Sequence, residues 1–306
     1  MVEKIIPGLK MSCYNTTLMG VLKGVTDYFQ IPLTDAWLFG GSGHAFLINV
    51  HEVLCPSGPY VWRRETFYKL VKNLGVEMTD LGFYHSKSTA EEIKQVEAVL
   101  REKIDSGTPC SLLNMENQLI SGYNEKQFLA QQPWPKVDFP PKTLTFQTWE
   151  ELGKEIHINF FTYTHVEKAD DRTTIKESLN YAVDLAKNPA KYRHEHYSIG
   201  LEAYDTWIKA VEAGYGSSHG NWWNGTVWME CRDMASKYLT EIASKTRGET
   251  VEKALNLSRQ YGKIANLLNQ ARDKKFPDAE KIKVLQEARK TEEECMNEIQ
   301  DLLNTL

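Results

Sequence analysis

Cys13 is the residue whose type and position most directly favour covalent chemistry. It lies in KMSCYNTTLMGVLKGV, where a loop leads into a predicted amphipathic helix with Leu18, Leu22 and Val25 on one side. The positive end of a helix dipole stabilises a thiolate, and the amide groups of a first helical turn can bind an oxyanion. This context predicts a nucleophile that accepts an acyl group. A buried structural cysteine is the alternative interpretation.

A cysteine nucleophile needs a base, and His44 is the candidate for that role. It stands in GGSGHAFLINV, where three glycines permit close backbone approach before a predicted strand. A thiol, an imidazole and an orienting carboxylate are the parts of a nucleophile–base group. His51, from the same segment, is the rival base. The alternative for His44 is a hydrogen bond to a loop and no catalytic role.

The other histidines give weaker signals. His194 and His196 flank Glu195, but no third ligand follows at helical spacing, so no metal site is predicted. His157 and His165 fall on one face of a strand-like run, which permits a role in a cleft without requiring it.

Tryptophans cluster at Trp222, Trp223 and Trp228. Their spacing favours helix packing, with the wall of an acyl pocket as the alternative. Arg63 and Arg64 form a small basic step that could meet a phosphate or an acidic carrier protein.

The elements that must position these residues differ between the two parts of the chain. Residues 1–168 mix short apolar runs with helical patterns and do not alternate as βαβ units, which predicts an α+β domain. Residues 169–306 show helical periodicity and little proline, which predicts an all-helical domain. The predicted strands lie at 45–50, 118–123 and 158–166, and the predicted helices at 15–29, 64–74, 89–106, 171–187, 198–213, 224–245, 249–274 and 278–304.

Composition restricts the class of protein. The 306 residues carry 36 Lys and Arg against 41 Asp and Glu, a net charge of −5, which argues against a nucleic-acid binder. No apolar run is long enough to span a membrane, and the first residues lack the features of a secretory signal, so a cytoplasmic protein is expected. The five cysteines form no CxxC pair and are expected to be thiols.

Several segments together resemble one known family. Cys13 opens a helix that leads to YFQIPLTDAWLFGGSGHAFLINV, and the segments that follow are CPSGPYVWRRETFYKLVKNLGV, SGTPCSLLNMENQLISGYNEKQFLAQQP, IGLEAYDTWIKAVE and HGNWWNGTVWMECRDMASKYL. The chain resembles the papain-like cysteine-protease superfamily, in the branch of the amino-terminal domain of butirosin biosynthesis protein H. It is also similar to the amide-bond-forming cysteine-protease homologues of polythioamide assembly.

The resemblance implies a papain-like core over about residues 5–135, with a cysteine-headed helix packed on an antiparallel sheet. It also implies an activity: transfer of an acyl group from a carrier-protein thioester, through the cysteine, to a small amine or diamine in natural-product biosynthesis. Phosphopantetheine would arrive on the acyl or peptidyl carrier protein, so no cofactor of the chain's own is implied. Nucleic acid and membrane are not expected as partners.

The sequence departs from the family pattern at the base. Glu116 or Asn117 stands where the family has its histidine, Asn124 and Gln132 stand where it has aspartates, and Pro7 replaces a helper glutamine. Either the chain has lost catalysis, or its base comes from another segment.

We therefore predict a catalytic group of Cys13, His44 and Glu116, in which Glu116 orients the His44 ring. Asn117 is an alternative orienting residue. The alternative functions are a cysteine peptidase or thioester hydrolase, and a non-catalytic binding protein with a papain-like fold.

Overall fold

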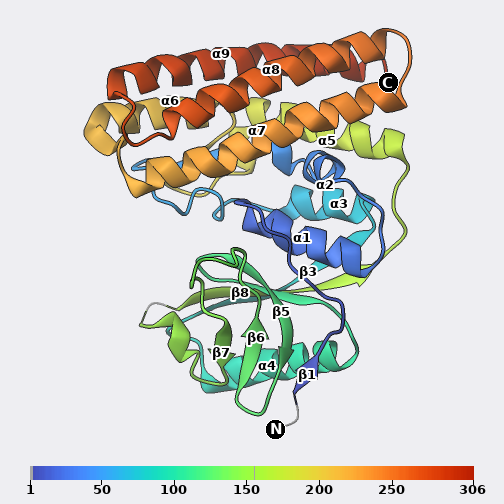
Figure 1. Cartoon of the computed structure of the whole chain (residues 1–306), viewed down its shortest axis with the longest axis vertical. Coiled ribbons are helices and arrows are strands. Elements are labelled where there is room, and N and C mark those ends of the chain that lie inside the picture. Colours follow the sequence, from blue (N-terminus) through green and yellow to red (C-terminus); the bar gives the residue numbers. More distant parts are fainter. Residues whose placement is uncertain (1–2, 155) are drawn as a thin grey trace. The chain divides into compact units, whose positions relative to one another are not determined.

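A computed structural model describes residues 3–154 and 156–306, which form two compact units (Figure 1). Unit 1 comprises the chain up to Leu33 together with Gly75–Lys168, and unit 2 comprises Thr34–Leu74 together with Ala169–Leu306. The predicted α+β class is confirmed, because unit 1 contains an antiparallel sheet and unit 2 is mainly helical. The expected division at 168/169 assigned residues 34–74 to the first domain, whereas the structure assigns them to unit 2.

Unit 1 is built on a seven-stranded sheet in the described part of the chain. Its order is β3-β8-β4-β5-β6-β7, β1 pairs with β5, and every pair is antiparallel. The strands are β1 (Lys4–Ile5), β3 (Val76–His85), β4 (Cys110–Leu113), β5 (Asn117–Tyr123), β6 (Gln127–Ala130), β7 (Thr143–Thr145) and β8 (His157–His165).

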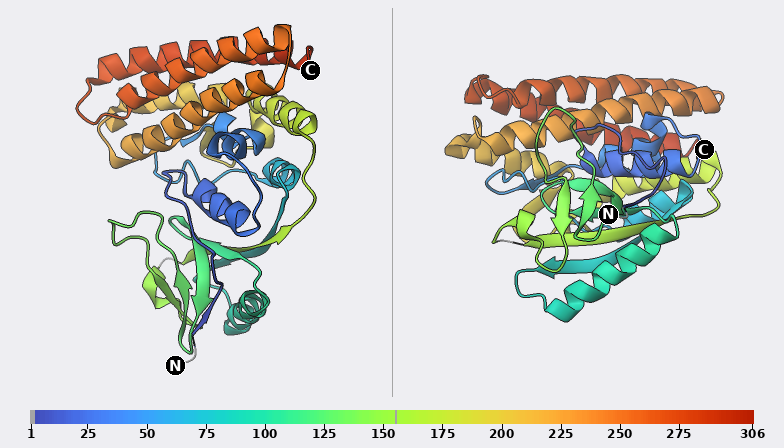
Figure 2. Two further views of the ribbon diagram at one scale, coloured as in Figure 1. Left: turned by 45° about the vertical axis from the view of Figure 1, so that its right-hand side comes forward. Right: turned by 60° about the horizontal axis from the view of Figure 1, so that its bottom comes forward.

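Two helices cover this sheet. Helix α1 (Thr17–Tyr28) packs on β5, and α4 (Ala90–Asp105) packs on β4 and β1, so that the central strands lie between the two helices (Figures 1 and 2). All four residues of β4 are buried, as expected for a strand covered on both faces. Thr89 caps α4 in a capping box with Glu92, which explains why the sequence marks its start so clearly.

Two glycines let the chain segment before α1 cross that helix closely. A Cβ atom at Gly20 would lie 2.4 Å from the Ser12 carbonyl oxygen, and one at Gly24 would lie 2.4 Å from the Lys10 carbonyl oxygen. Larger side chains would therefore push the segment that carries Cys13 off the helix.

The Gly24→Ala variant is expected to lose about 1–3 kcal/mol of unfolding free energy, because its methyl group would overlap fixed backbone and the Leu119 side chain. Urea denaturation measures this loss. Gly262→Ala is the matched control, because its Cβ would meet only the Ser236 hydroxyl at 3.4 Å. The control is expected to be neutral or to gain up to about 1 kcal/mol from helix propensity. Equal stability of the two variants would contradict the close crossing.

Unit 2 contains the remaining helices and a two-stranded sheet, in the part of the chain that the structure describes. The strands β2 (Asn49–His51) and β9 (Tyr197–Ile199) pair antiparallel. The helices are α2 (Asp35–Gly41), α3 (Glu65–Asn73), α5 (Asp171–Lys187), α6 (Leu201–Ala210), α7 (His219–Lys245), α8 (Glu249–Ala271) and α9 (Asp278–Leu303). Short 3-10 turns lie at His44–Phe46, Glu150–Leu152 and Pro189–Lys191, the second of them in unit 1, and a π-helical turn follows α6 at Val211–Tyr215.

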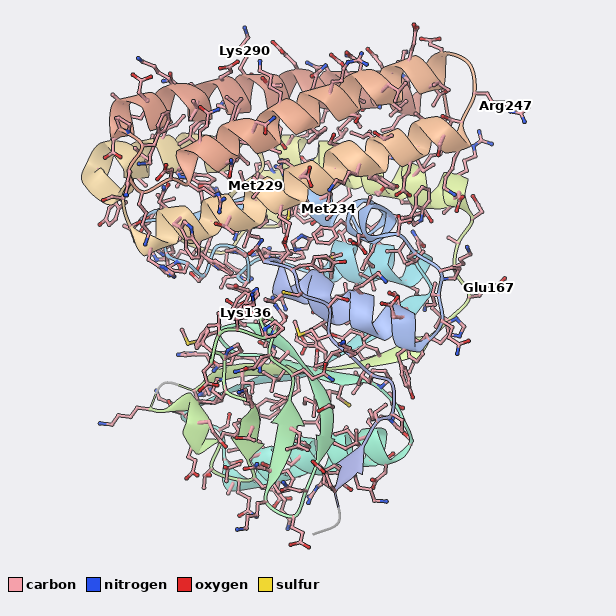
Figure 3. The ribbon with its side chains drawn as sticks, in the orientation of Figure 1. Lys136, Glu167, Met229, Met234, Arg247 and Lys290 are labelled. Atoms are coloured by element: carbon pink, nitrogen blue, oxygen red, sulfur yellow. The ribbon has the colours of Figure 1, made fainter. Side chains whose placement is uncertain are left out.

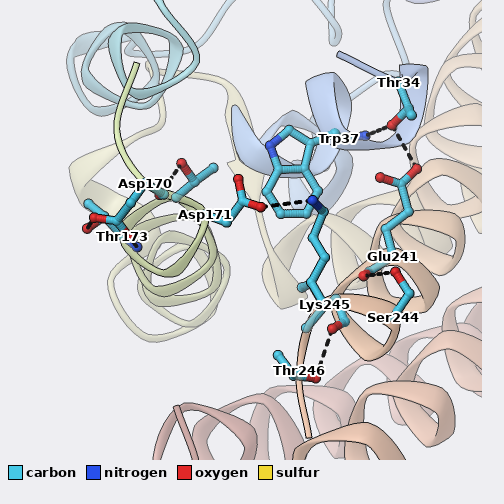
Figure 4. A network of polar contacts seen from close by, with 11 residues as sticks. Thr34, Trp37, Asp170, Asp171, Thr173, Glu241, Ser244, Lys245 and Thr246 are labelled. Atoms are coloured by element: carbon cyan, nitrogen blue, oxygen red, sulfur yellow. Dashed lines mark hydrogen bonds and ion pairs between the residues drawn. The ribbon is translucent and has the colours of Figure 1, made fainter. Parts of the chain in front are cut away.

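Contacts between α2 and α7 explain why residues 34–74 belong to unit 2. The Thr34 hydroxyl caps α2 through the Trp37 amide and also donates to Glu241 at 2.7 Å (Figure 4). Lys245 lies 4.7 Å from the centre of the Trp37 ring. A Cβ atom at Gly40 would overlap the Tyr238 ring, so close packing of α2 on α7 requires glycine there.

A buried ion pair joins three segments of unit 2. Arg232 is bidentate to Glu292, with contacts of 2.6 and 2.9 Å, and it also donates to the carbonyl oxygens of Ala45 and Leu47. Tyr204 donates to the same carboxylate. Both charged side chains are almost fully buried, so each needs the other for its hydrogen bonds.

The predicted helices at 171–187, 249–274 and 278–304 are confirmed within three residues at each end. The prediction of a strand at 45–50 is mostly wrong, because His44–Phe46 form a 3-10 turn and β2 begins at Asn49. The sequence patterns also missed α2 and β3. Among residues 3–154 and 156–306, none of the helices has the length and apolarity to cross a membrane.

Candidate functional site

The Cys13 thiol is exposed and lies in unit 1 on the non-helical segment before α1. The sequence placed the thiol at the head of the helix, but α1 begins at Thr17, four residues later. The buried structural role that was the alternative for Cys13 does not apply to an exposed side chain. The thiol is therefore accessible to a reactant.

Side chains from a distant loop hold the segment that carries Cys13. The Gln131 amide accepts from the Met11 N–H at 2.7 Å and donates to the Leu9 carbonyl oxygen at 2.8 Å. On the other side of the thiol, the Trp134 indole N–H donates to the Tyr14 carbonyl oxygen at 3.2 Å. The backbone is thus held at Met11, two residues before Cys13, and at Tyr14, the residue after it, which reduces the freedom of the thiol.

Glu116, in the turn between β4 and β5, lies beside Thr17, the first residue of α1. Its Oε2 accepts from the Thr17 hydroxyl at 2.8 Å, and the side chain is buried. The Asn117 backbone and side-chain N–H groups donate to the same hydroxyl at 3.1 and 3.2 Å. A carboxylate in this position is favoured by the positive end of the helix dipole. Thr17 is the residue of this group that the sequence analysis did not single out.

His44 lies in unit 2, inside an aromatic core. Its ring is 1% exposed and lies 5.8 Å from the ring centres of Trp62 and Phe67 and 6.3 Å from that of Trp228. Its Nδ1 is 3.5 Å from the Cys231 sulfur. The thiol beside His44 within this unit is therefore that of Cys231, and no pattern in the sequence indicated this pair.

Burial lowers the pKa of the His44 imidazole to about 3, and the positive charges of Arg64 and Arg232 act in the same direction. The ring is neutral at pH 7 and is a weak base. The role predicted for His44 in deprotonating Cys13 would require this ring to leave the core, which is unfavourable.

The buried His44 predicts acid sensitivity. Its pKa in the folded protein lies below the ordinary value of 6.5, so the unfolded chain binds more protons between these limits. The contribution of the neutral His44 ring to the free energy of unfolding is present above pH 6.5 and is lost as the pH falls below that value. We expect a loss of about 2 kcal/mol of unfolding free energy between pH 7 and pH 5 that the His44→Phe variant lacks. Urea denaturation at both pH values tests this, and equal losses in the two proteins would refute it.

Several of the remaining histidines take part in local contacts or in strand pairing. In unit 2, the Nδ1 of His51 accepts from the Val53 N–H at 3.2 Å, and His196 pairs with Glu52 at 3.2 Å. In unit 1, His85 and His157 are opposite each other on β3 and β8. His165 contacts Phe29, beyond the far end of α1 and about 18 Å along that helix from its start.

The three clustered tryptophans of unit 2 are buried or, in the case of Trp222, half-buried. Trp228 is fully buried, and Trp223 donates to the Tyr60 hydroxyl at 3.0 Å, which agrees with the helix-packing interpretation. Arg64 lies 5.5 Å from the centre of the Trp62 ring, so its guanidinium takes part in the fold of this loop. Among the described residues, no group of three His, Cys, Asp or Glu side chains is arranged to hold a metal ion.

Comparisons with known proteins do not assign this chain to a family. No protein-family model matches it, and no curated protein matches it significantly. The papain-like resemblance therefore stays a prediction, and the architecture established by the structure is α+β with an antiparallel sheet.

Proposed function

We propose that this protein is a cysteine-dependent acyltransferase with a papain-like core in unit 1. Cys13 would take an acyl group from a carrier-protein thioester and pass it to a small amine, forming an amide. The observation that carries the proposal is an exposed thiol on a fixed segment directly before α1, a helix that packs on the antiparallel strand β5. The family resemblance implies a cysteine-headed helix packed on an antiparallel sheet, and here the thiol lies four residues before such a helix.

The reaction has two acyl-transfer steps. In the first, the Cys13 sulfur bonds to the thioester carbonyl carbon, the bond to the carrier's pantetheine sulfur breaks, and that thiol leaves with a proton. In the second, the amine nitrogen bonds to the same carbon, the bond to Cys13 breaks, and a proton from the amine returns to the Cys13 sulfur. Thioester exchange is nearly isoenergetic and amide formation is downhill, so ATP is not required.

Proton transfer in these steps needs a group near the start of α1. Glu116 is the carboxylate at this position, where it accepts from Thr17, the first helical residue. We propose Glu116 as the candidate proton acceptor in place of an imidazole. His44 remains in the proposal only as a base that acts after its ring leaves the core of unit 2.

Incubation of the protein with an acyl-carrier-protein thioester, with and without a diamine, tests the proposal. We expect an amide product that depends on the diamine. Free acid formed at the same rate in both mixtures would instead identify a thioester hydrolase or peptidase-like enzyme.

A non-catalytic binding protein is the second candidate. It is favoured by the position of Glu116, where the resembling enzymes have a histidine, and by the hydrogen bond of Glu116 with Thr17, which suits a structural role. A chain that forms neither amide nor acid, and carries no acyl group after incubation, would support this candidate.

A further inference from the structure

The loop after β6 is held in one shape at its base. We name residues 131–142 the rim loop. The Ala130 N–H donates to the Lys142 carbonyl oxygen at 2.8 Å, and the Gln118 side chain donates to the carbonyl oxygens of Gln131 and Pro141 at 3.2 and 2.8 Å. Four prolines in the loop further restrict its backbone. The rim loop is therefore preformed.

The rim loop is attached to the segment that carries the thiol. Gln131 binds the backbone on one side of Cys13, and Trp134 binds the carbonyl oxygen of the next residue, Tyr14. Lys136, two residues after Trp134 in the sequence, is exposed on the rim loop (Figure 3). The Trp134 indole thus contacts the residue that directly follows Cys13 in the chain.

Apolar side chains are exposed on the rim loop and on the turn between β4 and β5. Val137, on the rim loop, is 47% exposed. Met115, on the turn between β4 and β5 and next to Glu116, is 61% exposed. Single exposed apolar residues are common. These two, however, lie on loops that are bonded to the segment from Cys13 to Thr17. Trp134 of the rim loop binds Tyr14, and Glu116, next to Met115, binds Thr17.

We propose that Met115, Trp134 and Val137 form an apolar rim that binds the acyl group of the thioester. The substrates would be thioesters of extended aliphatic or aromatic acids, and short or charged acyl groups would react more slowly. Of the charged residues on the rim loop, Asp138 is paired with Lys142 at 3.0 Å, and Lys136 is exposed. The inference rests on the proposed function, and it names the substrate class of the same site.

The test measures how fast Cys13 is acylated by the N-acetylcysteamine thioesters of acetic, hexanoic and benzoic acids, followed by intact mass. We expect hexanoyl and benzoyl transfer to exceed acetyl transfer by at least about tenfold. The double variant Met115→Gln, Val137→Thr keeps side-chain size at exposed positions and is expected to reduce this preference to about threefold or less. Its alkylation by iodoacetamide, a small reagent, should be unchanged.

Phe83→Gln is the matched control, because Phe83 is an exposed apolar residue of the same unit on strand β3, opposite Asn159 of β8. It should keep the acyl preference. Equal rates for the three thioesters, or an unchanged preference in the double variant, would overturn the apolar rim and leave the acyltransferase proposal intact. Failure of all three thioesters to acylate Cys13, while iodoacetamide still alkylates it, would overturn both.

Discussion

The Arg232→Met variant is expected to lose about 3–5 kcal/mol of unfolding free energy. Methionine fills much of the same volume but leaves the Glu292 carboxylate buried without its cation. It also removes the donors to Ala45 and Leu47, which hold the turn that contains His44. Urea denaturation followed by circular dichroism measures the change.

Two further variants separate the loss of the ion pair from a general effect of substitution. Replacing both partners, Arg232→Met with Glu292→Met, removes the uncompensated charge and should recover a large part of the loss. Arg289→Met breaks a partly exposed pair with Asp205 and should cost less than about 1 kcal/mol. A single Arg232→Met variant as stable as the Arg289→Met variant would contradict the account of the core.

The Cys13→Ser variant is expected to lose amide formation by more than about a hundredfold, because a serine hydroxyl is a far weaker nucleophile than a thiol at neutral pH. Its stability should be almost unchanged, since Cys13 is exposed. The measurement is the initial rate of amide formation from a hexanoyl thioester and a diamine.

Cys55→Ser is the matched control for this loss. Cys55 is a partly exposed cysteine of unit 2, and the proposed reaction does not use it. Its variant should form the amide at the rate of the unchanged protein. A comparable fall in both variants would show that the loss does not come from a nucleophile at position 13.

Local patterns predicted the helices well because their signals lie close together in the sequence. Asp170 caps α5 through the Thr173 amide, and apolar residues then recur at helical spacing up to Lys187. The same patterns could not assign residues 34–74 to unit 2. That assignment depends on contacts such as Thr34 with Glu241, between residues more than two hundred positions apart.

The candidate site was predictable only in part. Cys13 stands out by its residue type and by the amphipathic pattern that follows it. The contacts that fix its segment come from Gln131 and Trp134, about 120 positions along the chain, and a glutamine or tryptophan in a loop gives no local sign of such a role. His44 was chosen for its glycine-rich surroundings. Those glycines instead allow close packing, since a Cβ at Gly43 would overlap the Tyr181 ring.

Locating a transferred acyl group within the chain tests the central claim most directly. The protein is incubated with the hexanoyl thioester, digested, and sequenced by tandem mass spectrometry. We predict one hexanoyl group on the peptide that contains Cys13 and its loss when a diamine is added. An acyl group found on Cys55 or Cys231 instead, or one on Cys13 that the diamine does not remove, would contradict the account.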